Sequence, residues 1–277
     1  MNRKRIILTV PIFLLLITGG AAILYPPIHR IMFQQGNQVI DQDLTIVVGG
    51  GGNSGILVTD SAVVVIDTKM GPDAEKLYNQ AKAKAGAKKI IVVNTHYHND
   101  HVKGNMYYKG SDIYIGSYDP GFLKENLDPD NLPNHFVKDS LIMNLGNERV
   151  CLYNLGPAHT WKDMVVVLKN RKVLFTGDLV FNRINPFLVQ KSGANVDTWI
   201  GTLDWMLKLP DLAMVVPGHG ETGDRAIISQ MKTYFLDMKA AAADPSKEEA
   251  MKLKYKDWTV FPGMTSPENS INYIRNP

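Results

Sequence analysis

The 277-residue sequence contains a single cysteine, Cys151, and this scarcity removes two classes of architecture. One cysteine cannot form an intramolecular disulfide, and it cannot build a metal site of clustered thiolates. Cys151 lies inside an apolar run of strand length, whereas a catalytic thiol needs an electropositive and partly open setting. We therefore expect a buried, unreactive side chain at this position.

The body of the chain also lacks an excess of positive charge. The formal net charge is +3, from 30 basic and 27 acidic residues. Arg3, Lys4 and Arg5 account for the whole excess, because the other 27 basic residues (30 − 3 = 27) balance the 27 acidic ones. A neutral body lacks the broad basic surface that nucleic-acid binding requires, so we expect no nucleic-acid partner.

These three basic residues are followed directly by an apolar segment. Residues 6–24 carry no charge and, as a helix, would extend about 28 Å, close to the roughly 30 Å core of a bilayer. The pattern is typical of an export signal or a signal anchor, and small residues at 20–22 offer a cleavage site. We expect residues 1–25 to be a signal peptide or an uncleaved membrane anchor, and the rest to be periplasmic or extracellular.

A glycine-rich segment contains Gly50, Gly52 and Gly55 in the G-x-G-x-x-G spacing of dinucleotide-binding loops. That motif needs a helix directly after it, so that the pyrophosphate meets a helix N-terminus. Residues 56–67 are instead rich in β-branched residues, which predicts strands. We interpret the segment as a glycine-rich connection between strands.

Short strands alternate with helices along the body of the chain, which predicts an α/β protein built in layers. Strands are expected at 44–48, 56–59, 62–67, 89–94, 113–115, 141–144, 149–155, 164–169, 172–175 and 213–216, helices at 73–85, 196–207 and 224–243, a loop-rich connection over 119–134, and a short last helix after 262. One stripe of the helix at 224–243 is interpreted as core packing: Ile227, Ile228, Met231, Phe235 and Met238.

The most informative segment is Thr-His-Tyr-His-Asn-Asp-His at residues 95–101, directly after a predicted strand. It holds four candidate metal ligands: His96, His98, Asp100 and His101. From the composition, H-x-H-x-D-H is expected by chance in roughly 4 of 10,000 such sequences, so chance does not explain it. The spacing does not place all four on one helical face and suits a tight loop facing two adjacent metal ions. Imidazole and carboxylate together favour zinc or a neighbouring first-row metal.

Three more candidates follow predicted strands, each with a glycine in the same loop: His159, Asp178 and His219. Ligands at successive strand ends would gather along one rim of a sheet and form a single site. His29 and His135 lack such a setting, so we interpret them as solvated or locally bonded side chains.

Taken in order, these motifs resemble those of the metallo-β-lactamase fold family over residues 44–222. The matching positions are Asp67, the loop 96–101, His159, Asp178 and His219. The resemblance implies a four-layer αββα sandwich with a two-metal cleft at one edge of both sheets. We expect this domain to occupy residues 40–245, with residues 246–277 packed on it as a C-terminal helix and tail.

The resemblance also implies a role for each ligand. His96, His98 and His159 would hold the first metal; Asp100, His101 and His219 would hold the second; and Asp178 would bridge the two. Asp67 would orient ligands without binding a metal. The implied cofactor is zinc, two ions per chain, with iron or manganese left open. A metal-activated water would be the nucleophile, and Asp100 has a second, catalytic role in orienting it and relaying a proton.

Fold does not fix the substrate, so three classes of function stay open. The first is a metal-dependent hydrolase that cleaves an ester, thioester, lactone or β-lactam bond in a small molecule. The second is a mononuclear iron sulfur dioxygenase or another redox enzyme on the same fold, and the third is a non-catalytic binding protein. Asp178 stands where lactamases of the family carry cysteine, which favours the Asp-bridged hydrolases.

Residues that would bind the substrate are not assigned by the sequence, and neither is the oligomeric state. No basic C-terminal pattern for glutathione binding is found. Five loop residues lie near the motifs, and ordinary surface or packing roles are the favoured interpretation for each. They are Trp161, Lys162, Asn182, Arg183 and Phe187.

Overall fold

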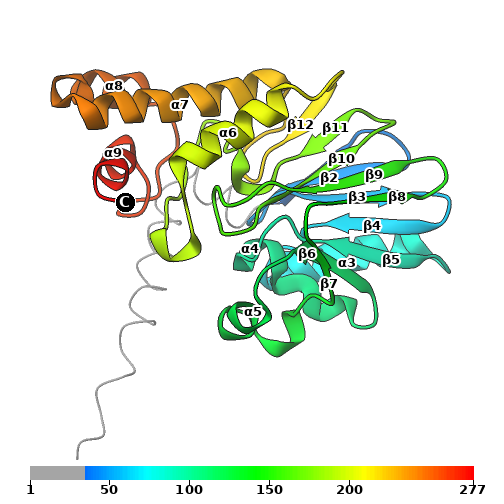
Figure 1. Cartoon of the computed structure of the whole chain (residues 1–277). Helices are drawn as coiled ribbons and strands as arrows, with labels where there is room; N and C mark the ends of the chain where they lie inside the picture. Colours follow the sequence, from blue (N-terminus) through cyan, green and yellow to red (C-terminus); the bar gives the residue numbers. More distant parts are fainter. Residues whose placement is uncertain (1–34) are drawn as a thin grey trace, which may run out of the picture.

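The computed structural model describes residues 35–277, which form two facing β-sheets with helices on both outer sides (Figure 1). The apolar segment at 6–24 and His29 lie outside the described residues. Among the helices of residues 35–277, none has the length and apolar character needed to cross a bilayer.

The first sheet contains seven strands, which follow one another in chain order. They are β1 (Gln35–Val39), β2 (Leu44–Gly49), β3 (Ser54–Val58), β4 (Ala62–Ile66), β5 (Lys89–Val93), β6 (Asp112–Gly116) and β7 (His135–Val137). Strands β1 to β4 pair antiparallel, whereas β4 to β7 pair parallel. The parallel pairing of β4 with β5 needs a crossover, which helix α3 (Gly71–Ala85) supplies.

The second sheet contains five strands in the order β12-β11-β10-β9-β8. They are β8 (Ser140–Asn144), β9 (Arg149–Asn154), β10 (Met164–Leu168), β11 (Val173–Phe175) and β12 (Met214–Val216). Neighbours pair antiparallel except β11 and β12, which pair parallel. Helix α6 (Val196–Leu207) lies between β11 and β12 in the chain and makes that crossover.

Alternating side chains on the buried strands divide among three apolar layers, as the two-residue period of a strand dictates. On β4, Val64 packs between the two sheets, while Val63 faces α3. On β10, Val166 packs between the sheets, while Val165 faces α6 and helix α7 (Arg225–Ala243). The layers are therefore α3, the first sheet, the second sheet, and α6 with α7, which confirms the expected αββα arrangement.

Smaller elements complete the chain. They are α4 (Asn99–Val102), α5 (Pro120–Asn126), α8 (Glu248–Lys254), α9 (Pro267–Arg275) and the 3-10 turns η1 (Lys103–Tyr108), η2 (Pro129–Asn131), η3 (Gly177–Leu179), η4 (Gln190–Ser192) and η5 (Pro245–Lys247). The C-terminal residues Tyr255, Phe261 and Ile271 are buried in the same apolar cluster as α7. Figure 1 shows α8 and α9 grouped beside α7, away from α3.

The structure contains elements that the sequence does not predict. The connection at 119–134 contains helix α5, which begins where the Asp119 carboxylate accepts a hydrogen bond from the Phe122 amide at 3.0 Å. No strand is expected before residue 44, yet β1 pairs with β2 along its whole length. The sequence of β1 is polar, so it carries no alternation of apolar residues that would predict a strand.

The expected burial of Cys151 and of the α7 stripe is confirmed. Cys151 is a free thiol with 3% of its surface exposed, on β9 under the outer helices. All five stripe residues of α7 are buried.

Two adjacent residues of α7 give a matched test of this packing. Phe235 is 0% exposed and its ring centroid lies 4.7 Å from that of Trp199, whereas Leu236 is 47% exposed. We expect Phe235→Ala to lower the free energy of unfolding by roughly 3 kcal/mol, through lost burial and a cavity. Leu236→Ala should stay within about 0.5 kcal/mol of wild type. Urea denaturation measures both, and equal effects would contradict the assignment of this face to the core.

Candidate metal centre

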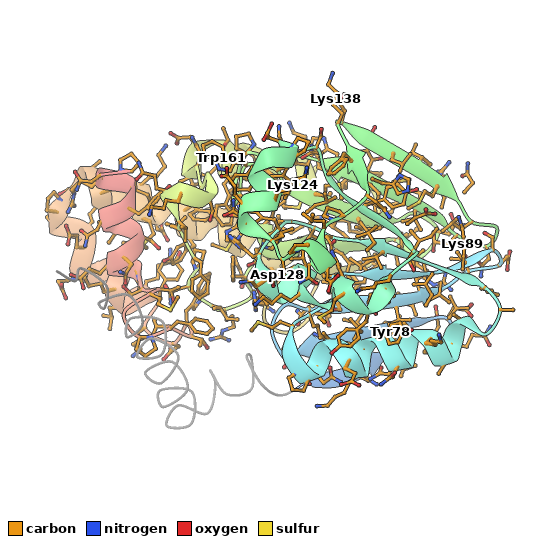
Figure 2. All side chains as sticks on the ribbon, turned by 90° about the horizontal axis from the view of Figure 1, so that it is seen from below. Tyr78, Lys89, Lys124, Asp128, Lys138 and Trp161 are labelled. Atoms are coloured by element: carbon orange, nitrogen blue, oxygen red, sulfur yellow. The ribbon has the colours of Figure 1, made fainter. Side chains whose placement is uncertain are left out.

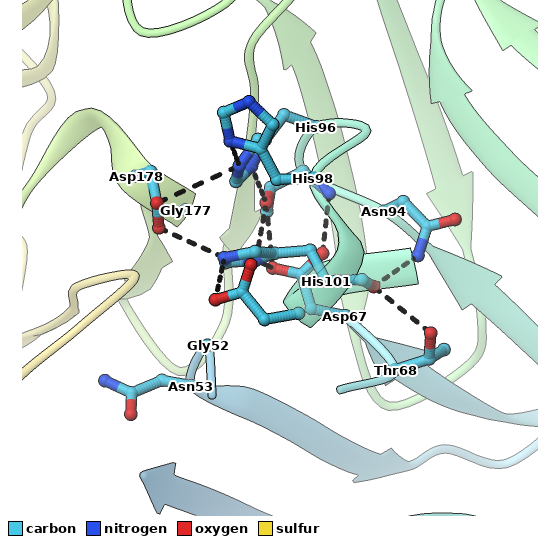
Figure 3. A network of polar contacts seen from close by, with 12 residues as sticks. Gly52, Asn53, Asp67, Thr68, Asn94, His96, His98, His101, Gly177 and Asp178 are labelled. Atoms are coloured by element: carbon cyan, nitrogen blue, oxygen red, sulfur yellow. Dashed lines mark hydrogen bonds and ion pairs between the residues drawn. The ribbon is translucent and has the colours of Figure 1, made fainter. Parts of the chain in front are cut away.

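Each candidate ligand follows the C-terminal end of a strand. Asp67 follows β4, the loop 96–101 follows β5, His159 follows β9, Asp178 follows β11 and His219 follows β12. These strands belong to both sheets, so the ends that meet here lie at one shared edge of the sandwich. Figure 3 shows side chains from this edge converging, among them His96, His98 and Asp178.

The first group of side chains consists of His96, His98, His159 and Asp178, whose ligand atoms all lie within 4.8 Å of one another. His98 Nδ1 lies 3.1 Å from His96 Nε2 and 3.0 Å from His159 Nε2. Tetrahedral zinc with bonds of 2.0–2.1 Å has ligand atoms separated by about 3.3 Å. The three imidazole nitrogens are thus spaced as ligands of one cation would be.

The second group consists of Asp100, His101 and His219, again within 4.8 Å. Asp100 Oδ2 lies 3.6 Å from His101 Nε2 and 3.2 Å from His219 Nε2. Helix α4 brings Asp100 and His101 together, because they are its second and third residues. This set of two imidazoles and one carboxylate also suits zinc or a neighbouring first-row metal.

Asp178 lies between the groups and divides its two oxygens among them. Oδ2 lies 3.5 Å from His159 Nε2 and 3.9 Å from His96 Nε2. Oδ1 lies 3.1 Å from His101 Nε2 and 3.5 Å from His219 Nε2. The close approach of the β12 loop depends on Gly218, where a Cβ atom would lie 2.0 Å from Asp178 Oδ1.

Two buried atoms show that the donor set fits a cation. His101 Nε2 and Asp178 Oδ1 lie 3.1 Å apart, yet neither has a partner in hydrogen-bonding geometry. Buried polar atoms are nearly always satisfied, and a metal ion bound to both would satisfy this pair. Seven side chains therefore offer nitrogen and oxygen atoms that could hold two adjacent ions.

The electrostatics of the two groups differ. Burial lowers the pKa of the first group's imidazoles, that of His159 to about 3, so these rings are neutral near pH 7 and can donate lone pairs. In the second group burial by itself would lower the pKa of the imidazoles, but the nearby carboxylates, Asp178 first and then Asp67 or Asp100, together outweigh it. The pKa of His219 is raised to about 9, and that of His101 lies well above its usual value. These carboxylates attract positive charge that a divalent cation would supply.

Asp67 lies outside both groups and holds His101 from behind. Its Oδ2 lies 2.8 Å from His101 Nδ1 and accepts a hydrogen bond from Thr95 Oγ1 at 2.8 Å, while Oδ1 accepts one from the Thr95 amide at 2.7 Å. A carboxylate on the far nitrogen of a ligating histidine fixes the tautomer and the ring orientation. The contacts agree with the orienting role that the resemblance implies.

Two supporting residues escaped the sequence analysis. Ser192 Oγ lies 3.2 Å from His98 Nε2 and accepts a hydrogen bond from Tyr97 at 2.9 Å. Asp163 accepts hydrogen bonds from the amides of Ala158 and Thr160, which flank His159 in the chain. Asp163 follows His159 by four residues and could have been noticed, whereas Ser192 lies 94 residues from His98 and no local pattern marks it.

The remaining candidates are not among the metal-ligating side chains. His135 stacks on Tyr114 and its Nε2 lies 3.1 Å from Asp112 Oδ1, so the interpretation of a locally bonded histidine is confirmed. Trp161 is 48% exposed (Figure 2). It lies against Gly193, the residue that follows Ser192. Its position on the loop that carries His159 places it near the first group. Phe187 packs partly buried against the core, and Asn182 donates a hydrogen bond to the Glu221 carbonyl.

Comparison with known proteins settles the family. The sequence profile described as Metallo-beta-lactamase superfamily matches residues 47–219, which include every candidate ligand. The chain belongs to this superfamily. Its relatives include a Metallo-beta-lactamase type 2 of Bacteroides fragilis, 29% identical over 181 residues, covering 64% of this chain and 72% of that protein. They also include an acyl-coenzyme A thioesterase of Homo sapiens, 23% identical over 196 residues, covering 57% of this chain and 69% of that protein.

Solved structures of the superfamily share the fold. A metallo-beta-lactamase from Pontibacter korlensis aligns with a TM-score of 0.64 at 24% identity, covering 74% of this chain and 100% of that one. The relatives named here are hydrolytic enzymes, in agreement with the expected metallo-β-lactamase-like hydrolase.

Proposed function

We propose that this protein is a two-zinc hydrolase that adds water to the carbonyl carbon of an ester, thioester, lactone or β-lactam in a small molecule and breaks the acyl–O, acyl–S or acyl–N bond. The observation that carries the proposal is the placement of Asp178, with one oxygen toward each ligand group. A shared carboxylate is what a centre of two adjacent ions needs, and two-metal centres serve hydrolysis of carbonyl and phosphoryl groups. The second group offers three ligands of its own, Asp100, His101 and His219, which a centre with a single iron ion would not need.

Different side chains of the site would have different roles in the reaction. When bound, zinc supplies a Lewis acid and lowers the pKa of water to about 7, so that a nucleophile exists at neutral pH. The imidazoles and Asp178 fix the position of the reacting centre. Asp100 is 21% exposed against 5% for Asp178, so its carboxylate lies on the more open side. We assign Asp100 the task of orienting the attacking water and passing its proton to the leaving group.

A substrate panel tests the proposal. Zinc-loaded protein is assayed on a cephalosporin, an acyl-coenzyme A thioester, a γ-lactone and an aryl ester, together with His159→Ala and the exposed-histidine control His135→Ala. We expect at least one class to be hydrolysed, His135→Ala to match wild type, and His159→Ala to lose at least about a hundredfold in kcat/KM. One iron per chain with oxygen consumption and no hydrolysis would replace the proposal by a redox function.

An exported location is part of the proposal. Three basic residues ahead of the apolar run 6–24 support a signal peptide or anchor at residues 1–25, with the enzyme periplasmic or extracellular. An exported enzyme would meet external small molecules rather than cytosolic metabolites. Fractionation of cells that express the full chain tests the location.

A further inference from the structure

The glycine loop, residues 49–53, lies against the second ligand group. A Cβ atom at Gly51 would lie 3.1 Å from the Cβ of Asp100, and one at Gly52 would lie 2.4 Å from His101 Cε1. The next residue, Asn53, donates from its amide to the Gly218 carbonyl at 2.7 Å and from Nδ2 to the Pro217 and Gly220 carbonyls at 2.9 and 2.8 Å. These carbonyls flank His219, so the loop supports all three ligands of the second group.

One buried lysine holds this loop in place. Lys69 is 0% exposed, and its Nζ donates to the carbonyls of Val47 at 3.1 Å, Gly49 at 2.6 Å and Gly52 at 2.7 Å. Three donated hydrogen bonds use all three N–H groups of an ammonium, whereas a neutral amine has only two. A methionine of similar length would fill the same space without bonding these carbonyls. The three donors of the Lys69 ammonium therefore correspond to the three backbone carbonyls that face it.

The segment that carries Lys69 also holds His101 directly. Asp67 contacts the His101 imidazole, and both the amide and the hydroxyl of Thr68 donate to the His101 carbonyl, at 2.8 and 3.1 Å. Residues 67–69 thus support His101 at its side chain, at its backbone and, through the glycine loop, at its ring face. Figure 3 shows Gly52 and Asn53 on one side of His101 and Asp67 and Thr68 near it.

Charge explains how an ammonium is tolerated at this depth. Burial lowers the pKa of Lys69 to about 7, and the carboxylates of Asp73, Asp100 and Asp67 oppose that shift. The first ligand group is supported from other directions, since Ser192 contacts His98 and Asp163 binds the backbone on both sides of His159. Loosening the glycine loop should therefore act on one group and spare the other.

We propose that Lys69 is a positioning residue for the second metal ion: its ammonium fixes the glycine loop, and the loop sets the separation of Asp100, His101 and His219. The inference rests on the two-ion site of the proposed function. It gives the G-x-G-x-x-G segment, which leads into strand β3 and not into a helix, a role in supporting metal ligands.

The test is a zinc titration of the full chain against a chromophoric chelator, with metal content measured after dialysis. We expect Lys69→Met to weaken the second ion by roughly 10- to 100-fold and to leave the affinity of the first unchanged. The control is Lys88→Met, because exposed Lys88 donates to a single carbonyl, that of Thr59, away from the site. Lys69→Gln, which keeps two of the three N–H donors, replaces Lys69→Met if that variant does not fold.

A second pair of variants tests the loop itself. Gly52→Ala should weaken the second ion selectively, because the added methyl displaces His101, whereas Gly201→Ala on α6 meets nothing within 4 Å and should bind both ions normally. Wild-type affinity for the second ion in a folded Lys69 variant would overturn the inference, and so would equal weakening of both ions. Binding of only one ion by the wild type would instead overturn the two-ion function.

Discussion

Asp178→Asn should reduce hydrolysis by at least about a thousandfold and lower the bound zinc below two ions per chain. The substitution keeps the size of the side chain but removes its charge and replaces one oxygen by an amide nitrogen, which is not a metal ligand. Each group then loses either its shared oxygen or the charge that attracts the ion. A thousandfold loss corresponds to about 4 kcal/mol of transition-state stabilisation, within what a centre of two ions supplies.

Matched measurements separate this effect from a general loss of stability. Asp257→Asn makes the same chemical change at an exposed position and should leave both the rate and the metal content unchanged. Values of kcat/KM, zinc per chain and the thermal midpoint are compared for the two variants. Full zinc content together with wild-type kcat/KM in Asp178→Asn would show that the bridging assignment is wrong.

Local sequence signals predict most of this fold because many of its strands are short, continuous apolar runs bounded by turn residues. The helix at 196–207 and the strands at 164–169 and 172–175 follow from apolar periodicity and turn residues, which are local properties. Strand β1 is not predicted because Val39 is its only apolar side chain and the strand is defined by its pairing with β2. The energy of pairing depends on both strands, so the sequence of one strand alone does not predict it.

In the candidate site, too, the sequence predicts residues that are close in the chain but not residues that only folding brings together. The loop 96–101 is visible in the sequence because four ligands share one turn. Ser192 and Lys69 are not visible, since each acts through atoms that only the folded chain brings close. Lys69 lies 17 to 22 residues from its three acceptor carbonyls in the chain. A lysine within an apolar surrounding gives no sequence signal, so its burial was found only in the structure.

The negative charge at the site should affect the stability of the folded protein. Asp67, Asp100 and Asp178 place three carboxylates around the second group, all at least partly buried. Without a cation, protons on His101 and His219 are the nearest compensation, which is why the pKa values of both are raised above the usual value. Lys69 adds a positive charge behind them when it is protonated. Bound metal should therefore stabilise the folded chain as well as support the reaction.

Removal of the metal with a chelator should abolish hydrolysis and lower the thermal midpoint. An ion present at a thousand times its dissociation constant stabilises the folded state by about 4 kcal/mol. For a body of this size, that energy corresponds to a shift of roughly 8–16 °C. We expect differential scanning fluorimetry to show this decrease for the chelated protein, with added zinc restoring both the midpoint and the activity.

Magnesium is the control for this experiment. It prefers six oxygen ligands, so a site of five imidazoles and two carboxylates should not bind it, and added magnesium should restore neither property. Phe235→Ala changes a core side chain and no metal ligand. This variant should be less stable than wild type yet show the same increase in thermal midpoint on zinc addition. An unchanged midpoint and full activity after exhaustive chelation would mean that the clustered histidines and aspartates do not hold a functional metal.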